Sequence, residues 1–345
     1  MQTNVNFGGV KNPSSMHSDS LPYVSILVPV YGVEDYIERC ARSVFEQTYP
    51  NIEYIFVDDA SPDRSVEILE QVMKDYPERA AHTRIIRFPE NRGLAIARNT
   101  LVDNCQTEWL LHVDSDDWVE KDIIETMVKK QQETGADMVI SDFVYEKENG
   151  QERFSFIRSD SKEDHFYQFL SNNDSHVVWG KLLRTAIIKE HNIRAIEHWP
   201  IKGEDWQVIV PIAYFSEKIV VTSHLGYHYE KTRDSALTHK SAETLPDYYK
   251  GIKTTLDFIS EFLKDKHKSY RDTFDKTYFE RMCFYMTLGS LFNNKDIHHA
   301  SRSKASQIIV DSKLSLNAKE FILFKVKSNY FIYKRFIHFM SAFSA

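Results

Sequence analysis

The sequence predicts an α/β protein in which helices cover both faces of a parallel β-sheet. Short apolar segments rich in β-branched residues alternate with segments whose apolar residues recur at helical spacing. Two of the strand-like segments end in acidic clusters, which places charged side chains at one edge of the sheet. The composition fits a globular domain, since 42% of the 345 residues are hydrophobic and 27% are charged.

The alternation of strands and helices begins near residue 23 and continues to about residue 145. Strands are expected at Tyr23–Tyr31, Ile52–Val57, Arg84–Phe88, Trp109–Val113 and Asp137–Tyr145. Helices are expected over 36–45, after Ser61, over Leu94–Val102 and over Ile123–Gln132. Ser61 is typical of an N-cap, because Pro62 and Asp63 then suit the first helical turn. Strands joined by crossover helices pair in parallel.

The remainder of the chain divides into three parts. The first twenty residues, rich in Asn, Ser and Gly, indicate a disordered tail rather than a signal peptide. A polar segment from Gln151 to Ser175 is expected to form an insertion or flap. From Leu245 the pattern is helical, and a boundary near Leu237–Ala242 separates an α/β unit over 21–237 from a helical region over 238–345.

Charge and cysteine content exclude several classes of protein. The net charge of −7 gives no basic field for nucleic acid. Cys40, Cys105 and Cys283 are far apart and odd in number, which favours a reducing cytoplasm over a disulfide framework. No apolar run reaches the 18 residues of a spanning helix. The sequence also lacks a G-x-G-x-x-G motif after the first strand and a Walker lysine, so a dinucleotide enzyme or P-loop ATPase is not expected.

The two acidic clusters are Asp58-Asp59 and Asp114-Ser115-Asp116-Asp117. Helix capping explains either cluster alone, but a ligand site is the better explanation for two clusters at the same sheet edge. Asp59 is suited to accept hydrogen bonds from a base or a ribose. Asp114 and Asp116 offer the hard oxygen ligands that Mg²⁺ or Mn²⁺ prefer, and such an ion neutralises a leaving diphosphate.

The segment from Val24 to about Ile124 resembles the inverting glycosyltransferase family 2. The resemblance rests on three motifs in order: SILVPVYGVEDYIERCARSVFEQTYPNIEYIFVDDASPDRS, ENRGLAIARN and LLHVDSDDW. Further along, Gly203-Glu204-Asp205-Trp206 resembles the Glu-Asp motif of the family, and Trp179–Leu182 and Tyr229–Ser235 resemble weaker features. The resemblance implies a GT-A fold with a Rossmann-like mixed sheet, followed by a helical C-terminal region.

The resemblance also implies roles for individual residues. The donor nucleotide and diphosphate would lie against Pro29, Val30, Tyr31, Glu34, Asp59, Arg98, Asp114, Ser115, Asp116, His228 and Arg233. Asp114 and Asp116 form the DxD motif, with Asp116 the more direct metal ligand and Asp117 an ambiguous neighbour. Asp205 is expected to be the catalytic base, and Glu204 is its rival. His228 stands where relatives carry a tyrosine, so its role is open.

The expected activity is transfer of a hexose or N-acetylhexosamine from a nucleotide diphosphate donor to a saccharide acceptor, in surface polysaccharide or glycan synthesis. UDP is the expected nucleotide, and the first acceptor to test is a lipid-linked saccharide. A sugar-phosphate nucleotidyltransferase is one alternative, although Val24–Glu34 contains only Gly32 of a glycine-rich signature. An inactive scaffold that binds nucleotide sugars is the other.

The C-terminal tail from Lys313 interleaves basic and aromatic residues. The basic ones are Lys313, Lys319, Lys325, Lys327, Lys334 and Arg335. This pattern fits an interfacial helix on the cytoplasmic face of an anionic membrane, and equally a helix packed on its own domain or on a second subunit. His298-His299 is interpreted as a solvated loop, and the sequon at Asn173 has no role in a cytoplasmic protein.

Overall fold

The computed structural model describes residues 21–171, 176–197, 203–231 and 245–278. Five features discussed above lie outside these residues: the N-terminal tail, the expected boundary, the sequon, His298-His299 and the basic-aromatic tail.

The strands are β1 (Val24–Val30), β2 (Ile52–Asp58), β3 (Thr83–Arg87), β4 (Trp109–His112), β5 (Trp118–Val119), β6 (Met138–Lys147), β7 (Gly150–Phe154), β8 (Lys181–Arg184) and β9 (Ile219–Glu230). The helices are α1 (Ile37–Phe45), α2 (Ser65–Met73), α3 (Pro77–Ala80), α4 (Leu94–Asn104), α5 (Ile123–Thr134), α6 (Lys162–Leu170), α7 (Thr185–Glu190), α8 (Glu204–Phe215) and α9 (Leu245–Leu263).

The described strands form one mixed sheet. Their order is β3-β2-β1-β4-β8-β6-β9-β5, and β7 pairs with β6 at the side. The pairs β1–β2, β1–β4, β2–β3 and β6–β9 are parallel, whereas β8 is antiparallel to both β4 and β6. The alternation of strands and helices correctly predicted the parallel half, and the mixed sheet is the one that the family resemblance implies.

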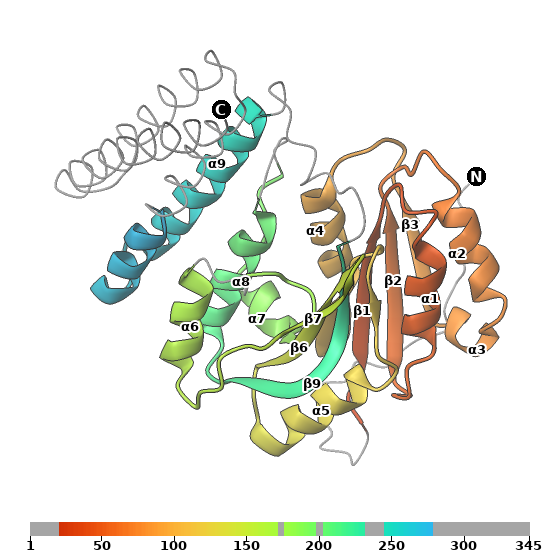
Figure 1. The fold of residues 1–345 in the computed structure, drawn as a ribbon, viewed down its shortest axis with the longest axis horizontal. Helices are drawn as coiled ribbons and strands as arrows, with labels where there is room; N and C mark the ends of the chain where they lie inside the picture. Colours follow the sequence, from red (N-terminus) through yellow and green to blue (C-terminus); the bar gives the residue numbers. More distant parts are fainter. Residues whose placement is uncertain (1–20, 172–175, 198–202, 232–244, 279–345) are drawn as a thin grey trace, which may run out of the picture.

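Helices cover both faces of the sheet (Figure 1). α4 lies against β1 and β2, and α1 and α2 lie on the opposite side. The buried residues of α1, Ile37, Cys40, Ala41, Val44 and Phe45, form the apolar stripe expected from their spacing. α6, α7 and α9 pack around α8 and form a second group of helices beside the sheet.

One local prediction was wrong. α2 begins at Ser65 rather than after Ser61, because Asp58 and Asp63 engage the backbone of this segment first. Asp58 Oδ1 accepts from the backbone N–H of Ser61 at 2.9 Å, and Asp63 Oδ1 accepts from that of Ser65 at 3.1 Å. These side-chain contacts form turns, so the helix begins further along the chain.

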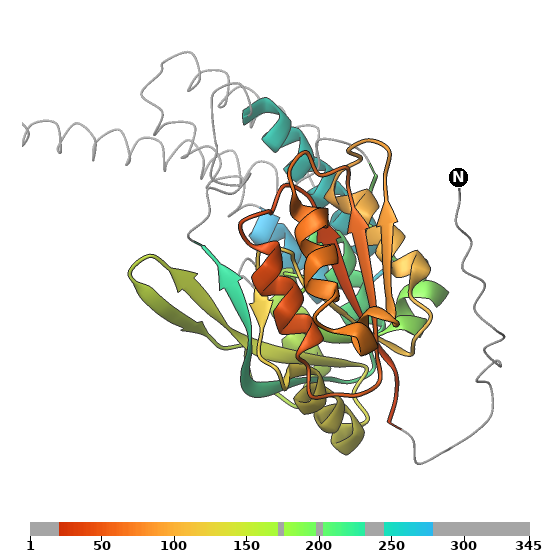
Figure 2. The same cartoon turned by 90° about the vertical axis from the view of Figure 1, so that its right-hand side faces the viewer.

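The segment after residue 150, which was expected to form an insertion or flap, contains regular secondary structure up to residue 170. It forms the hairpin of β6 and β7, which projects from the body (Figure 2), and then α6, which is N-capped by Ser161. β7 has an almost fully exposed burial pattern, so its sequence lacks the apolar signal of a buried strand. Among the described helices, none has the length and apolarity needed to cross a membrane.

Candidate active site

Asp59 lies at the end of β2 and fixes the loop that begins α4. Its Oδ1 accepts from the backbone N–H of Arg92 at 2.6 Å, and its Oδ2 accepts from that of Gly93 at 2.8 Å. Ala60, which follows, has a φ of 57°, a conformation that non-glycine residues rarely adopt. Asp59 is buried. The structure therefore places it at the expected sheet edge, where it anchors this loop.

The residues expected at the nucleotide pocket differ in exposure. Pro29 and Val30 are buried in β1, whereas the side chain of Tyr31 is 48% exposed at the strand end. Glu34 Oε2 accepts from the backbone N–H of Arg64 at 3.2 Å and forms an ion pair with its side chain. Tyr31 is thus the most exposed residue of this group.

The acidic turn after β4 separates its carboxylates into two environments. Asp117 is fully buried, and its oxygens accept from Tyr227 Oη at 2.6 Å and from the backbone N–H of Glu230 at 2.8 Å. Burial and the neighbouring Asp116 and Asp114 raise the pKa of Asp117 well above its ordinary value. Asp117 therefore connects the turn to β9, while Asp114 and Asp116 are partly exposed.

Arg98 joins the acidic turn to the start of α8. Its Nη2 donates to Asp114 Oδ1 at 2.7 Å, and its Nη1 contacts Asp205 and lies 3.7 Å from Glu204 Oε1. The Arg98 side chain is only 8% exposed. These carboxylates outweigh burial and raise the pKa of the guanidinium above its ordinary value, so Arg98 remains a cation.

Asp205 occupies the first turn of α8. Gly203 caps this helix in the left-handed region, with a φ of 82°, and a side chain there would meet Thr255 of α9. Burial raises the pKa of Asp205 to about 7, and Arg98 opposes this rise. The backbone N–H of Val178 donates to Asp205 Oδ2 at 3.4 Å. A carboxylate that titrates near neutrality is suited to accept a proton.

A cavity lies beside this carboxylate. It is lined by Arg98, Asn99, Val102, His112, Val178, Ile188, Ile193, Ala195, Glu204, Asp205 and Val208. His112 is 2% exposed, and burial together with Arg98 lowers its pKa to about 3. The imidazole is consequently neutral, and it adds no positive charge to the surroundings of Asp205.

The acidic turn fits a divalent cation that a bound ligand helps to hold. Within the described residues, no group of three or more Asp, Glu, His or Cys side chains is arranged to hold a metal ion. A Mg²⁺ site commonly needs only one or two carboxylates when ligand phosphates complete the coordination. Asp116 and Asp114 are partly exposed and supply two such carboxylates, of which Asp114 also accepts from Arg98. Asp117 is fully buried, and both of its oxygens accept hydrogen bonds from β9.

His228, on β9, contacts β6 and the segment that follows β5. Its Nδ1 lies 2.7 Å from Glu146 Oε1 of β6, and its Nε2 lies 3.0 Å from Glu120 Oε1, which follows β5. The ring stacks on Trp118 with a centroid distance of 3.4 Å. His228 thus contacts carboxylates through both ring nitrogens. Arg233, the other expected donor-binding residue of this part of the chain, lies outside the described residues.

Sequence reasoning missed three residues of this region: Tyr227, His112 and Lys181. Tyr227 Oη contacts both the Asp117 carboxylate and the backbone N–H of Asp114. His112 could have been suspected from its place directly before the acidic cluster. Lys181, within the Trp179–Leu182 motif, is fully buried. No sequence pattern indicates that a lysine is buried, since lysine is normally exposed.

Comparison with known families identifies similar sequences. The family described as Glycosyl transferase family 2 matches residues 25–190. Glycosyltransferase GlyA of Streptococcus pneumoniae is 30% identical over 61% of this chain and 31% of its own length. The putative glycosyltransferase EpsH of Bacillus subtilis is 29% identical over 74% of this chain and 73% of its own.

A third relative is the poly(ribitol-phosphate) beta-glucosyltransferase of Bacillus spizizenii. It is 30% identical over 65% of this chain and 34% of its own length, so the chain spans about a third of this protein and of GlyA.

Among solved structures, Staphylococcus aureus TarS 1-349 in complex with UDP-GlcNAc has a TM-score of 0.62. The match covers 83% of this chain and 81% of that one at 20% identity, and it shows the fold.

Proposed function

We propose that the chain is a family 2 glycosyltransferase that transfers a sugar, with inversion, from a nucleotide diphosphate donor to a saccharide acceptor. The family model that matches residues 25–190 and the GT-A fold support this proposal. The observation that carries this proposal is the contact of one buried guanidinium, Arg98, with Asp114 and Asp205. This contact places Asp114, a candidate ligand of the metal at the diphosphate, close to Asp205, the candidate base.

The chain's own residues supply three functions in this scheme. Asp205 takes the proton of the acceptor hydroxyl while that oxygen forms a bond to the anomeric carbon. The bond from this carbon to the diphosphate breaks, and its electron pair leaves with the diphosphate. Arg98 holds both carboxylates in place and provides a fixed positive charge beside the leaving group. Tyr31 is the exposed ring at the nucleotide edge.

Asp116 and Asp114 would hold Mg²⁺ or Mn²⁺ at the acidic turn. Glycosyltransferases of this fold commonly use such an ion, and when bound it neutralises charge on the diphosphate. UDP is the proposed nucleotide, since TarS was solved with UDP-GlcNAc. A polymer or lipid-linked saccharide of the cell surface is the proposed acceptor class, on the basis of the poly(ribitol-phosphate) relative.

A turnover experiment tests the proposal. The full chain is incubated with a panel of nucleotide diphosphate sugars, with and without Mn²⁺, and release of the nucleotide diphosphate is followed by chromatography. We expect one donor to be consumed, faster with a saccharide acceptor and with metal present. A chain that binds a nucleotide sugar but releases no nucleotide diphosphate from any donor would instead support the inactive scaffold.

A further inference from the structure

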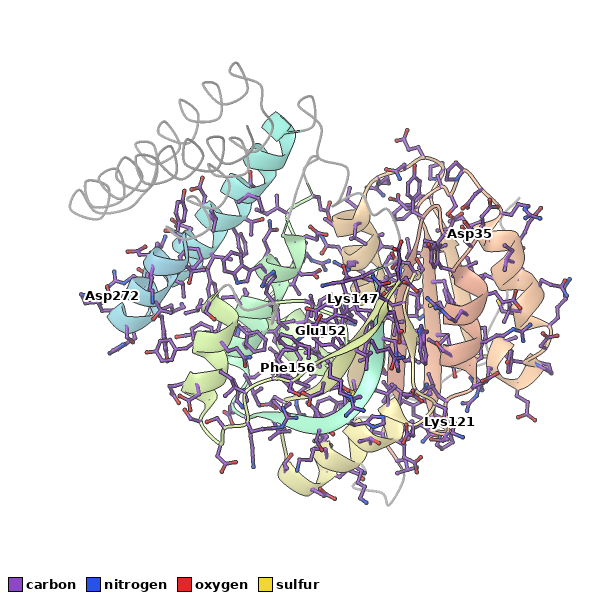
Figure 3. All side chains as sticks on the ribbon, in the orientation of Figure 1. Asp35, Lys121, Lys147, Glu152, Phe156 and Asp272 are labelled. Carbon is purple, nitrogen blue, oxygen red and sulfur yellow. The ribbon has the colours of Figure 1, made fainter. Side chains whose placement is uncertain are left out.

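Lys181 is a buried cation that the scheme above does not use. It begins β8, directly after Gly180, whose φ is 65°. Its side chain is fully buried, and the ammonium lies 4.9 Å from the ring centre of Phe156 and 6.0 Å from that of Phe169. Phe156 follows the β6–β7 hairpin, whose tip carries the paired side chains of Lys147 and Glu152 (Figure 3).

Lys181 contacts the peptide group that faces Asp205. Its Nζ donates to the carbonyl oxygen of Val177 at 2.6 Å and, more weakly, to that of Trp179 at 3.5 Å. The N–H of the same Val177–Val178 peptide donates to Asp205 Oδ2 at 3.4 Å. A peptide group is planar, so fixing its carbonyl also fixes the direction of its N–H.

Burying an ammonium group is unfavourable unless its contacts compensate for the lost hydration. Burial lowers the pKa of Lys181 to about 7, and the Asp205 carboxylate opposes this change. A methionine would fill similar space without the desolvation cost. Closing the turn at Gly180 is a structural role for the lysine, but that role does not account for the hydrogen bond from the same peptide group to Asp205.

We propose that Lys181 is a positioning residue for the base: through the Val177–Val178 peptide and its own charge, it orients Asp205 and favours the ionised carboxylate. The proposal rests on the proposed function, because it gives Asp205 the role of base. The peptide N–H and the nearby positive charge both stabilise the negative form of Asp205, so losing them raises the pKa of this carboxyl.

Other titratable groups lie around Asp205 and stay unchanged in the test. They come from α4, the end of β4, the turn after β4 and α8, and they are Arg98, the neutral His112, Asp114 and Glu204. A change in the titration of Asp205 on substitution of Lys181 alone is therefore attributable to Lys181 and the peptide that it holds.

The test compares Lys181→Met with Lys189→Met in the full chain. Lys189 is the matched control, since its ammonium also donates to a backbone carbonyl, that of Cys105, but on the exposed side of α7. For Lys181→Met we expect kcat to fall about 10- to 100-fold with donor KM unchanged, as for a misplaced catalytic group. The acidic limb of the pH–rate profile should move to higher pH. Lys189→Met should keep the wild-type kcat and the wild-type position of the acidic limb.

Titration of the Asp205 carboxyl by carbon NMR gives the same comparison without turnover, with Asp205→Asn used to assign the signal. A raised pKa in Lys181→Met is the expected result, whereas a wild-type pKa, kcat and acidic limb would overturn the inference. If Lys181→Met does not fold, Lys181→Gln replaces it in the test, because Gln keeps a hydrogen-bond donor but not the charge. The same rise in the pKa of the Asp205 carboxyl is then expected. Absence of turnover in the wild-type chain contradicts the proposed function alone, because the NMR comparison still tests Lys181.

Discussion

Arg98 donates a hydrogen bond of 2.7 Å from Nη2 to the carboxylate of Asp114. The other terminal nitrogen of the same guanidinium contacts Asp205, so one buried cation compensates carboxylates from two separate elements. These carboxylates would otherwise repel one another at the edge of the sheet. The site therefore depends on Arg98 for its stability and for its geometry.

Substituting Arg98 should lower stability more than substituting an exposed arginine. Arg98→Met leaves partly buried carboxylates without their cation, which typically costs about 3–5 kcal/mol in the free energy of unfolding. Arg87→Met is the control, because the Arg87–Glu70 pair is about half exposed and such pairs contribute about 1 kcal/mol or less. Urea unfolding of both variants gives the comparison. Equal losses would show that Arg98 is not the central ion-pair partner.

The two candidate carboxylates of the acidic turn should respond differently to substitution. Asp116→Ala should remove the metal dependence of UDP binding, measured by calorimetry with and without EDTA. Asp117→Asn should keep that dependence but lower the free energy of unfolding by about 1–3 kcal/mol, because Tyr227 or Glu230 loses a buried acceptor. The opposite result, with metal dependence lost only in Asp117→Asn, would assign the ion to Asp117.

Stability should depend on pH through Asp205. Its pKa of about 7 in the folded chain exceeds that of an unfolded aspartate, about 3.9, so the folded state binds the proton more tightly. The stability from this group is present below about pH 4 and falls as the pH rises to about 7, by at most about 1.4 kcal/mol per unit. Asp205→Asn cannot ionise, so its stability relative to wild type should increase across this range. Parallel curves for the two proteins would contradict this.

The C-terminal tail, which lies outside the described residues, gives a prediction from sequence alone. Lys325, Lys327, Lys334 and Arg335 should each add about 1 kcal/mol of attraction to an anionic surface. We propose that the tail binds such a membrane, and that replacing these four residues by Gln reduces co-sedimentation with anionic vesicles at low salt. Equal sedimentation of both chains would favour a packing or dimerisation role, which is the alternative for this segment.

Local patterns in the sequence were sufficient to predict the parallel half of the sheet. Buried strands such as β1 and β2 are continuous apolar runs, and α1 has a clear apolar stripe. β7 was missed because its side chains are exposed, and the start of α2 was misplaced because Asp58 and Asp63 form competing turns. Exposure and side-chain competition leave no periodic signal.

The candidate site was predictable only as a set of residue types at a sheet edge. The order of the motifs indicated Asp114 and Asp205 as site residues. Arg98 connects them, but Arg98 and Asp205 are 107 residues apart in the sequence. The different environments of Asp116 and Asp117 depend on Tyr227 and Glu230, more than 100 residues away. Such contacts are set by tertiary packing, which a single sequence does not state.

The most direct test of the proposed mechanism is sugar transfer by Asp205→Asn compared with Glu204→Gln. Both side chains face Arg98 and have similar exposure, 17% and 18%, so the pair is closely matched. For Asp205→Asn we expect kcat to fall by about 10²–10⁴-fold while UDP affinity is retained, because only the proton acceptor is removed. Glu204→Gln should retain most of its transfer activity. Full activity in Asp205→Asn together with an inactive Glu204→Gln would contradict the assignment of Asp205 as the base.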